Sequence, residues 1–131
     1  MKKLVLLVMF INLVFAVNVG VVAKNVDDII QIYVDGQEVA TCQWQGANCN
    51  TGKELNLKGK HTIEFKLTNL VYTGFCLFGG CGKYSGDFGV TANGKALWSG
   101  SVYVRDNTKG VKYDKVLECK FSDTKSYCIE K

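Results

Sequence analysis

The sequence contains no proline, a single histidine and no Asn-x-Ser/Thr glycosylation motif. Without proline, low-complexity stretches or a repeat of domain-building length, we expect one continuous domain. With a single histidine, only one residue could serve as the base in Ser-His-Asp or Cys-His catalysis. His61 alternates with Ile63 and Phe65, which predicts a strand-edge or buried histidine with satisfied ring nitrogens. We therefore expect no enzyme and no catalytic residues.

The short cysteine spacings that are typical of metal-binding and redox motifs are also missing. The six cysteines form close pairs spaced C-x6-C, C-x4-C and C-x8-C, and no C-x2-C occurs. The glycine-rich stretch 74–89 contains one Gly-Lys pair, but a tyrosine follows it, which excludes a nucleotide phosphate loop. We expect no cofactor and no metal. The alternative is calcium, for which Asp27, Asp28 and Asp106 would supply oxygens.

The first 23 residues have the layout of a secretory signal peptide. Lys2 and Lys3 precede a long apolar run, and Val-Val-Ala follows at 21–23. We expect cleavage after Ala23, with a cut after Ala16 as the alternative. Residues 1–23 would then be the signal peptide, and residues 24–131 would be the mature domain.

Export decides which partners the chain can have. Loss of Lys2 and Lys3 lowers the formal net charge from +4 to +2, and the remaining lysines are scattered along the chain. Nucleic acid binding needs a clustered basic surface, so we expect no nucleic acid partner. We expect a secreted or periplasmic monomer that has no membrane contact after cleavage.

The cysteines predict disulfide staples, because disulfides persist outside the reducing cytosol. Sequence alone leaves several connectivities open, but loop closure favours near neighbours. Each short loop would contribute roughly 2–3 kcal/mol. The favoured pairs are Cys42–Cys49, Cys76–Cys81 and Cys119–Cys128.

Alternating apolar residues and glycine turns predict an all-β domain. Asp35-Gly36 and Asn93-Gly94 each interrupt β-branched or alternating runs, which is typical of type I′ hairpins. The run 60–69 alternates like a half-buried strand, and we expect a turn at 50–53. Seven to nine short strands would make a single small antiparallel β-sandwich.

Three stretches together resemble the galactose-binding-like jelly roll over roughly residues 27–105. They are Asp28-x4-Tyr33-Val34-Asp35-Gly36, Leu57-Lys58-Gly59-Lys60-His61-x-Ile63 and Gly86-x-Phe88-x-Val90-x2-Asn93-Gly94. The resemblance implies two facing sheets and a carbohydrate-binding role, as in sugar-binding modules of secreted proteins. The close cysteine pairs and the lack of a catalytic partner domain differ from the family and favour a free-standing, lectin-like binder.

Aromatic residues near the glycine-rich stretch are the expected ligand site, because sugars stack on rigid rings and hydrogen-bond to polar groups. The alternatives are that Phe75 and Phe78 cap the core and that Trp44 fills it. We expect Trp98 in the core. The second functional hypothesis is a protein-binding factor such as an enzyme inhibitor or host-directed factor, and the third is a structural subunit. The candidate ligand-binding residues are Trp44, Phe75, Phe78, Lys83, Tyr84 and Asp87.

Overall fold

The computed structural model describes residues 16–70, 83–106 and 108–131, with the backbone alone for 44–48. These residues contain no helix, and so none that is long and apolar enough to cross a membrane. The expected all-β class is confirmed. The strands are β1 (Val17–Val34), β2 (Gln37–Leu57), β3 (Gly59–Asn69), β4 (Lys83–Ala92), β5 (Lys95–Arg105), β6 (Gly110–Phe121) and β7 (Tyr127–Glu130).

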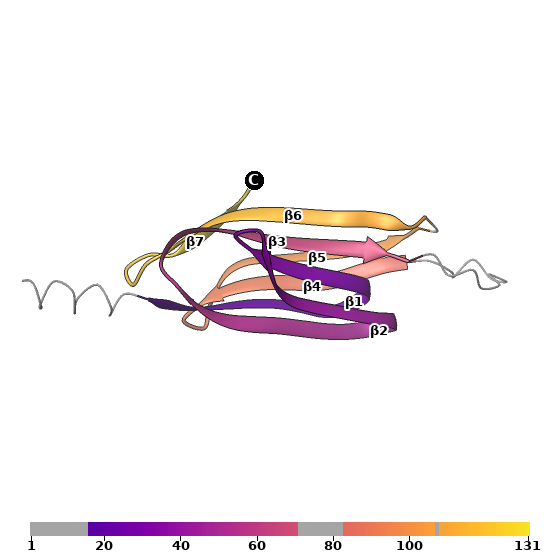
Figure 1. The fold of residues 1–131 in the computed structure, drawn as a ribbon, viewed down its shortest axis with the longest axis horizontal. Helices are drawn as coiled ribbons and strands as arrows, with labels where there is room; N and C mark the ends of the chain where they lie inside the picture. The colour runs from indigo at the N-terminus through magenta and orange to yellow at the C-terminus, as the bar shows by residue number, and fades with distance from the viewer. Residues whose placement is uncertain (1–15, 71–82, 107) are drawn as a thin grey trace, which may run out of the picture.

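One antiparallel sheet folds back on itself around β1 (Figure 1). β2 pairs with one edge of β1 along almost its whole length. The other edge of β1 pairs with β4 up to Asp27 and with β3 from Ile29 onward. The sheet therefore divides into two facing layers. We call β4, β5 and the beginning of β1 the first layer, and β3, β6, β7 and the end of β1 the second layer.

β1 and β2 are longer than the short strands that we expected, because both serve the two layers. The β1–β2 register shifts between Ala23 and Val26 and again before Asp28, and Asn25 has a positive φ of 56°. Such irregularities bend a strand without ending its pairing. β1 can therefore leave one layer and continue in the other.

The signal-peptide cleavage position that we expected after Ala23 falls inside β1. The inward side chains of its first half, Val17, Val19, Val21 and Ala23, are at most 1% exposed. Residues 51–53, where we expected a turn, continue β2 and pair with residues 21–23. The two differences concern one paired region, because residues 17–23 are the strand partners of 51–57.

The core lies between the layers, where inward residues of β3 meet aromatic residues of the first layer. The Phe65 ring centroid lies 5.5 Å from that of Phe88 and 5.5 Å from that of Trp98. Trp98 packs against the buried cluster, as expected for a core residue. Its indole Nε1–H donates to Glu130 Oε1 at 3.0 Å, which links β5 to β7 and nearly closes the sheet.

The two Asx-Gly hairpin turns and two of the disulfides follow the sequence-based predictions. Asp35 and Gly36 have φ of 52° and 79°, and Asn93 and Gly94 have φ of 49° and 82°, as type I′ turns require. The disulfides Cys42–Cys49 and Cys119–Cys128 are confirmed, and the predicted pair Cys76–Cys81 lies outside the described residues. The two bridges indicate an oxidising compartment rather than the cytoplasm.

Candidate functional site

The predicted ligand residues are only partly within the described structure. Phe75, Phe78 and the side chain of Trp44 lie outside it. Lys83 and Asp87 lie on the outer face of β4, together with Ser85. Tyr84 has the opposite parity and packs against the core, so we leave it out of the candidate site.

A hollow of about 400 Å³ lies on the outer face of the first layer, and we call it the first-layer hollow. It forms because the cross-strand pairs Ser85–Tyr103 and Asp87–Ser101 place polar groups of β4 and β5 side by side. The bend of β1 brings Asn25 to the same face. The lining residues are Asn25, Lys83, Ser85, Gly86, Asp87, Ser101, Val102 and Tyr103.

Asp87 is the fixed polar centre of the first-layer hollow. Its Oδ2 accepts a hydrogen bond from Asn25 Nδ2 at 3.1 Å, and its Oδ1 accepts one from Ser101 Oγ at 2.8 Å. The bond from Asn25 and then that from Ser101 lower the pKa of the Asp87 carboxyl below its usual value. Asp87 therefore stays ionised near neutral pH, and its remaining lone pairs can accept further hydrogen bonds.

Tyr103 supplies an aromatic surface at the rim of this hollow. Its side chain is 63% exposed, which is uncommon for so large an apolar group. Lys83 Nζ lies 5.7 Å from the ring centroid, which is within the range of a cation–π contact. The Lys83 ammonium therefore lies against the ring at one end of the hollow.

Two glycines make the layer flat beneath the hollow. A Cβ on Gly86 would lie 2.5 Å from Cζ of Phe88, and one on Gly100 would lie 2.7 Å from the Trp98 ring. Both glycines thus leave room for core aromatic rings on the inner face. Their role here is packing rather than close approach of a ligand to the backbone.

A pair of buried carboxylates lies where β1 passes from one layer to the other. Asp27 and Asp28 are 7% and 6% exposed, and Asp28 Oδ2 accepts from the Leu70 N–H at 2.7 Å. Burial, and then the hydrogen bond and charge of Asp28, raise the pKa of Asp27 to about 7. Asp106, the third proposed calcium ligand, instead pairs with Lys112 at 3.2 Å. The described residues contain no group of three or more side chains placed to hold a metal ion.

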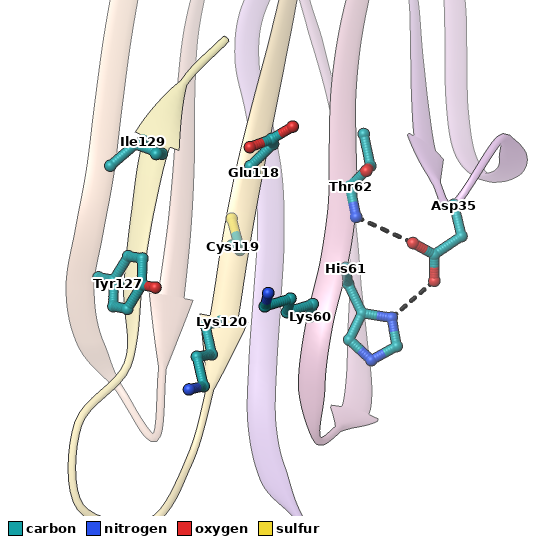
Figure 2. Close-up of a pocket in the computed structure, with 9 residues that line it drawn as sticks. All are labelled: Asp35, Lys60, His61, Thr62, Glu118, Cys119, Lys120, Tyr127 and Ile129. Carbon is teal, nitrogen blue, oxygen red and sulfur yellow. Dashed lines mark hydrogen bonds and ion pairs between the residues drawn. The ribbon is translucent and has the colours of Figure 1, made fainter.

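A second hollow, of about 380 Å³, lies on the second layer (Figure 2). We call it the second-layer hollow. β3 contributes Lys60 and His61, β6 contributes Lys120 and β7 contributes two exposed apolar residues. The lining residues are Asp35, Lys60, His61, Thr62, Glu118, Cys119, Lys120, Tyr127 and Ile129.

His61 is fixed by both ring nitrogens at the beginning of β3. Nδ1 lies 2.6 Å from Asp35 Oδ2, and Nε2 lies 2.9 Å from the carbonyl oxygen of Lys58. Burial lowers the pKa of His61, but the hydrogen bonds to Asp35 and to the Lys58 carbonyl, together with the Asp35 charge, outweigh it, and the net pKa is raised. Burial likewise opposes the shift of Asp35, whose net pKa is lowered by hydrogen bonds from His61 and the Thr62 N–H. Both ring nitrogens therefore donate when His61 is protonated.

The rest of the second-layer hollow combines two lysines and Glu118 with apolar surface. Lys60 and Lys120 are directly opposed across β3 and β6, and Tyr127 lies beside Lys120 across β6 and β7. Ile129 is 55% exposed and pairs with Glu118, two residues along each strand from the Lys120–Tyr127 pair. Like charges placed side by side repel each other, so a bound anionic group would relieve that repulsion.

Sequence reasoning missed three residues of the first-layer hollow: Asn25, Ser101 and Tyr103. The alternation of 101–105 did predict a strand with Ser101 and Tyr103 on one face. The register that sets Tyr103 opposite Ser85 depends on a shift between Val90 and Thr91 in the β4–β5 hairpin, which alternation alone does not encode.

No family model, no curated protein and no solved structure matches this chain.

Proposed function

We propose that the chain is an exported, non-catalytic protein that binds carbohydrate in the first-layer hollow. The observation that carries this proposal is the exposed Tyr103 ring beside the Asp87 carboxylate and the Ser101 hydroxyl. A sugar ring offers one apolar face for stacking, and its hydroxyls can donate to an ionised carboxylate. Asp87 is positioned by hydrogen bonds before a ligand arrives, which lowers the ordering cost of binding.

Other features support the remaining parts of the proposal. The hairpins at Asp35-Gly36 and Asn93-Gly94 support a jelly-roll relationship to galactose-binding-like modules. The disulfides support export through a cleaved signal peptide to the medium or periplasm. A non-catalytic role is supported by His61, whose two ring nitrogens are engaged by Asp35 and a backbone carbonyl.

The test is a glycan array probed with the oxidised full chain, with calcium and with chelator. We expect selective binding to neutral, hydroxyl-rich glycans that does not change with chelator. Tyr103→Ala removes the stacking surface and should weaken binding at least tenfold, since a stacked ring contributes on the order of 1.5 kcal/mol. Tyr127→Ala is the matched control, because Tyr127 is an exposed tyrosine on the other layer.

Two outcomes contradict the proposal. A blank array with folded, monomeric protein would exclude a lectin-like role. Equal loss from Tyr103→Ala and Tyr127→Ala would exclude the first-layer hollow as the place of binding.

A protein partner is the second candidate function, and the second-layer hollow favours it. Tyr127 and Ile129 are exposed beside Lys60 and Lys120, a combination that fits an acidic segment carrying apolar side chains. Size-exclusion chromatography against secreted enzymes would test it. A stoichiometric complex that Lys120→Glu abolishes and Lys83→Glu leaves intact would favour this function over carbohydrate binding.

A further inference from the structure

The first seven residues of β1 lie between β2 and β4. Their backbone pairs with β2 from Val17–Leu57 to Ala23–Thr51, and with β4 from Val19–Ala92 onward. β2 and β4 do not pair directly in the described sheet. This segment of β1, continued by residues 24–28, links β2 to β4.

The beginning of this strand is also fixed by a turn far away in the sequence. The Asn18 N–H donates to Asn93 Oδ1 at 3.0 Å, and the Asn93 N–H donates to the Asn18 carbonyl at 2.7 Å. The Asn93-Gly94 turn therefore contacts β1 at its second residue. Ala16, by contrast, is exposed and lies just before the strand.

A cut after Ala23 would be incompatible with this layer. It would remove four buried inward side chains and the backbone partners of both β2 and β4. An isolated two-stranded hairpin, such as β4 and β5 without β1, has only marginal stability in water. A chain beginning at Lys24 would keep only the Lys24–Asp87 and Asp27–Ser85 pairs between β1 and β4, so we expect the first layer and its hollow to be strongly destabilised.

The residues before Ala16 have the features of a leader that ends there. Lys2 and Lys3 precede a nearly continuous apolar run, which finishes in Val14-Phe15-Ala16 with a small residue at its end. The chain then alternates Val17-Asn18-Val19-Gly20-Val21, the period of a strand and not of a leader.

We propose that the Ala16–Val17 peptide bond is the processing site, and that the mature chain is 17–131. A signal peptidase adds water across this amide: the Ala16 carbonyl leaves as a carboxylate, and the Val17 nitrogen becomes the free α-amino group. The proposal rests on the export part of the proposed function and is independent of carbohydrate binding.

The experiment is export of the full chain in a bacterial host, followed by intact mass measurement and N-terminal sequencing of the periplasmic protein. The same chain is also treated with detergent-solubilised signal peptidase. We expect a product that begins at Val17. Ala16→Leu should lower the yield of this product at least tenfold, whereas Ala16→Ser keeps a small residue and should preserve it.

The outcomes separate the processing site from the function. A product that begins at Lys24, or unchanged processing of Ala16→Leu, overturns the site and leaves export intact. An uncut chain that stays in the cytosol and resists the peptidase overturns both the site and export. Carbohydrate binding is measured separately on the glycan array.

Discussion

The two layers differ in how they hold charge on their outer faces. On the first layer, neutral donors keep Asp87 ionised, and Lys83 lies over the Tyr103 ring. On the second layer, the Asp35 carboxylate faces an imidazole that titrates. The first hollow thus keeps a constant charge near neutral pH, whereas the second hollow changes its charge with His61. The titrating imidazole is itself one of the lining residues of the second hollow.

The shared core should give the largest effect, because it joins the two layers. Phe65→Ala would remove the ring that contacts Phe88 and Trp98 of the first layer. We expect a loss of about 3–5 kcal/mol in the free energy of unfolding, measured by urea denaturation. Val111→Ala at an exposed position should cost less than about 0.5 kcal/mol. Equal losses would show that the layers are not held together by this core.

The Cys119–Cys128 disulfide should stabilise the protein without shaping the first-layer hollow. Replacing both residues by serine reopens a short loop between β6 and β7. We expect a loss of roughly 3 kcal/mol in urea denaturation. Glycan binding without denaturant should be unchanged, because the hollow lies on β4 and β5. Weakened binding would contradict the separation of the two faces.

The buried Asp27 should make the joint between the layers sensitive to pH. Its pKa is about 7 in the folded protein and about 4 in the unfolded chain. Between these values the unfolded chain loses the proton first, so stability should fall as pH rises from about 4 to about 7. Asp27→Asn should flatten this part of a melting-temperature profile. An unchanged slope would show that Asp27 is ionised in the folded state.

The His61–Asp35 pair should give the smallest effect, because Asp35 is half exposed. The raised pKa of His61 makes its contribution complete below about pH 6.5, and the contribution is lost as pH rises through the folded value. The lowered pKa of Asp35 makes the same pair weaken in strong acid. We expect His61→Gln to cost below about 1 kcal/mol at pH 6 and less at pH 8. A cost that grows with pH would contradict this sign.

Local signals in the sequence predicted the two Asx-Gly hairpin turns, the all-β class and two disulfides. Asp35-Gly36 and Asn93-Gly94 determine their turn type through backbone sterics, and Cys119–Cys128 follows from short loop closure. These features depend on neighbouring residues, so a sequence reading can reach them.

Features that depend on distant pairing were missed. Residues 17–23 alternate as a strand does, but their high apolar content after a long apolar run also fits a leader. In the structure these residues pair with β2 and β4, which their alternation alone does not predict. Tyr103 was missed for a local reason: its pairing with Ser85 follows a register shift between Val90 and Thr91, and neither this shift nor the place of Tyr103 beside Lys83 is visible in residues 101–105 alone.

The passage of β1 and β2 through both layers has a consequence for cooperativity. β1 supplies a strand partner to β4 of the first layer and to β3 of the second layer, so loss of the β1–β2 hairpin would weaken both layers. The domain should therefore unfold as a single unit, with far-ultraviolet circular dichroism and tryptophan fluorescence changing together. The long β1–β2 hairpin, which both layers share, thus couples the stability of the two outer surfaces.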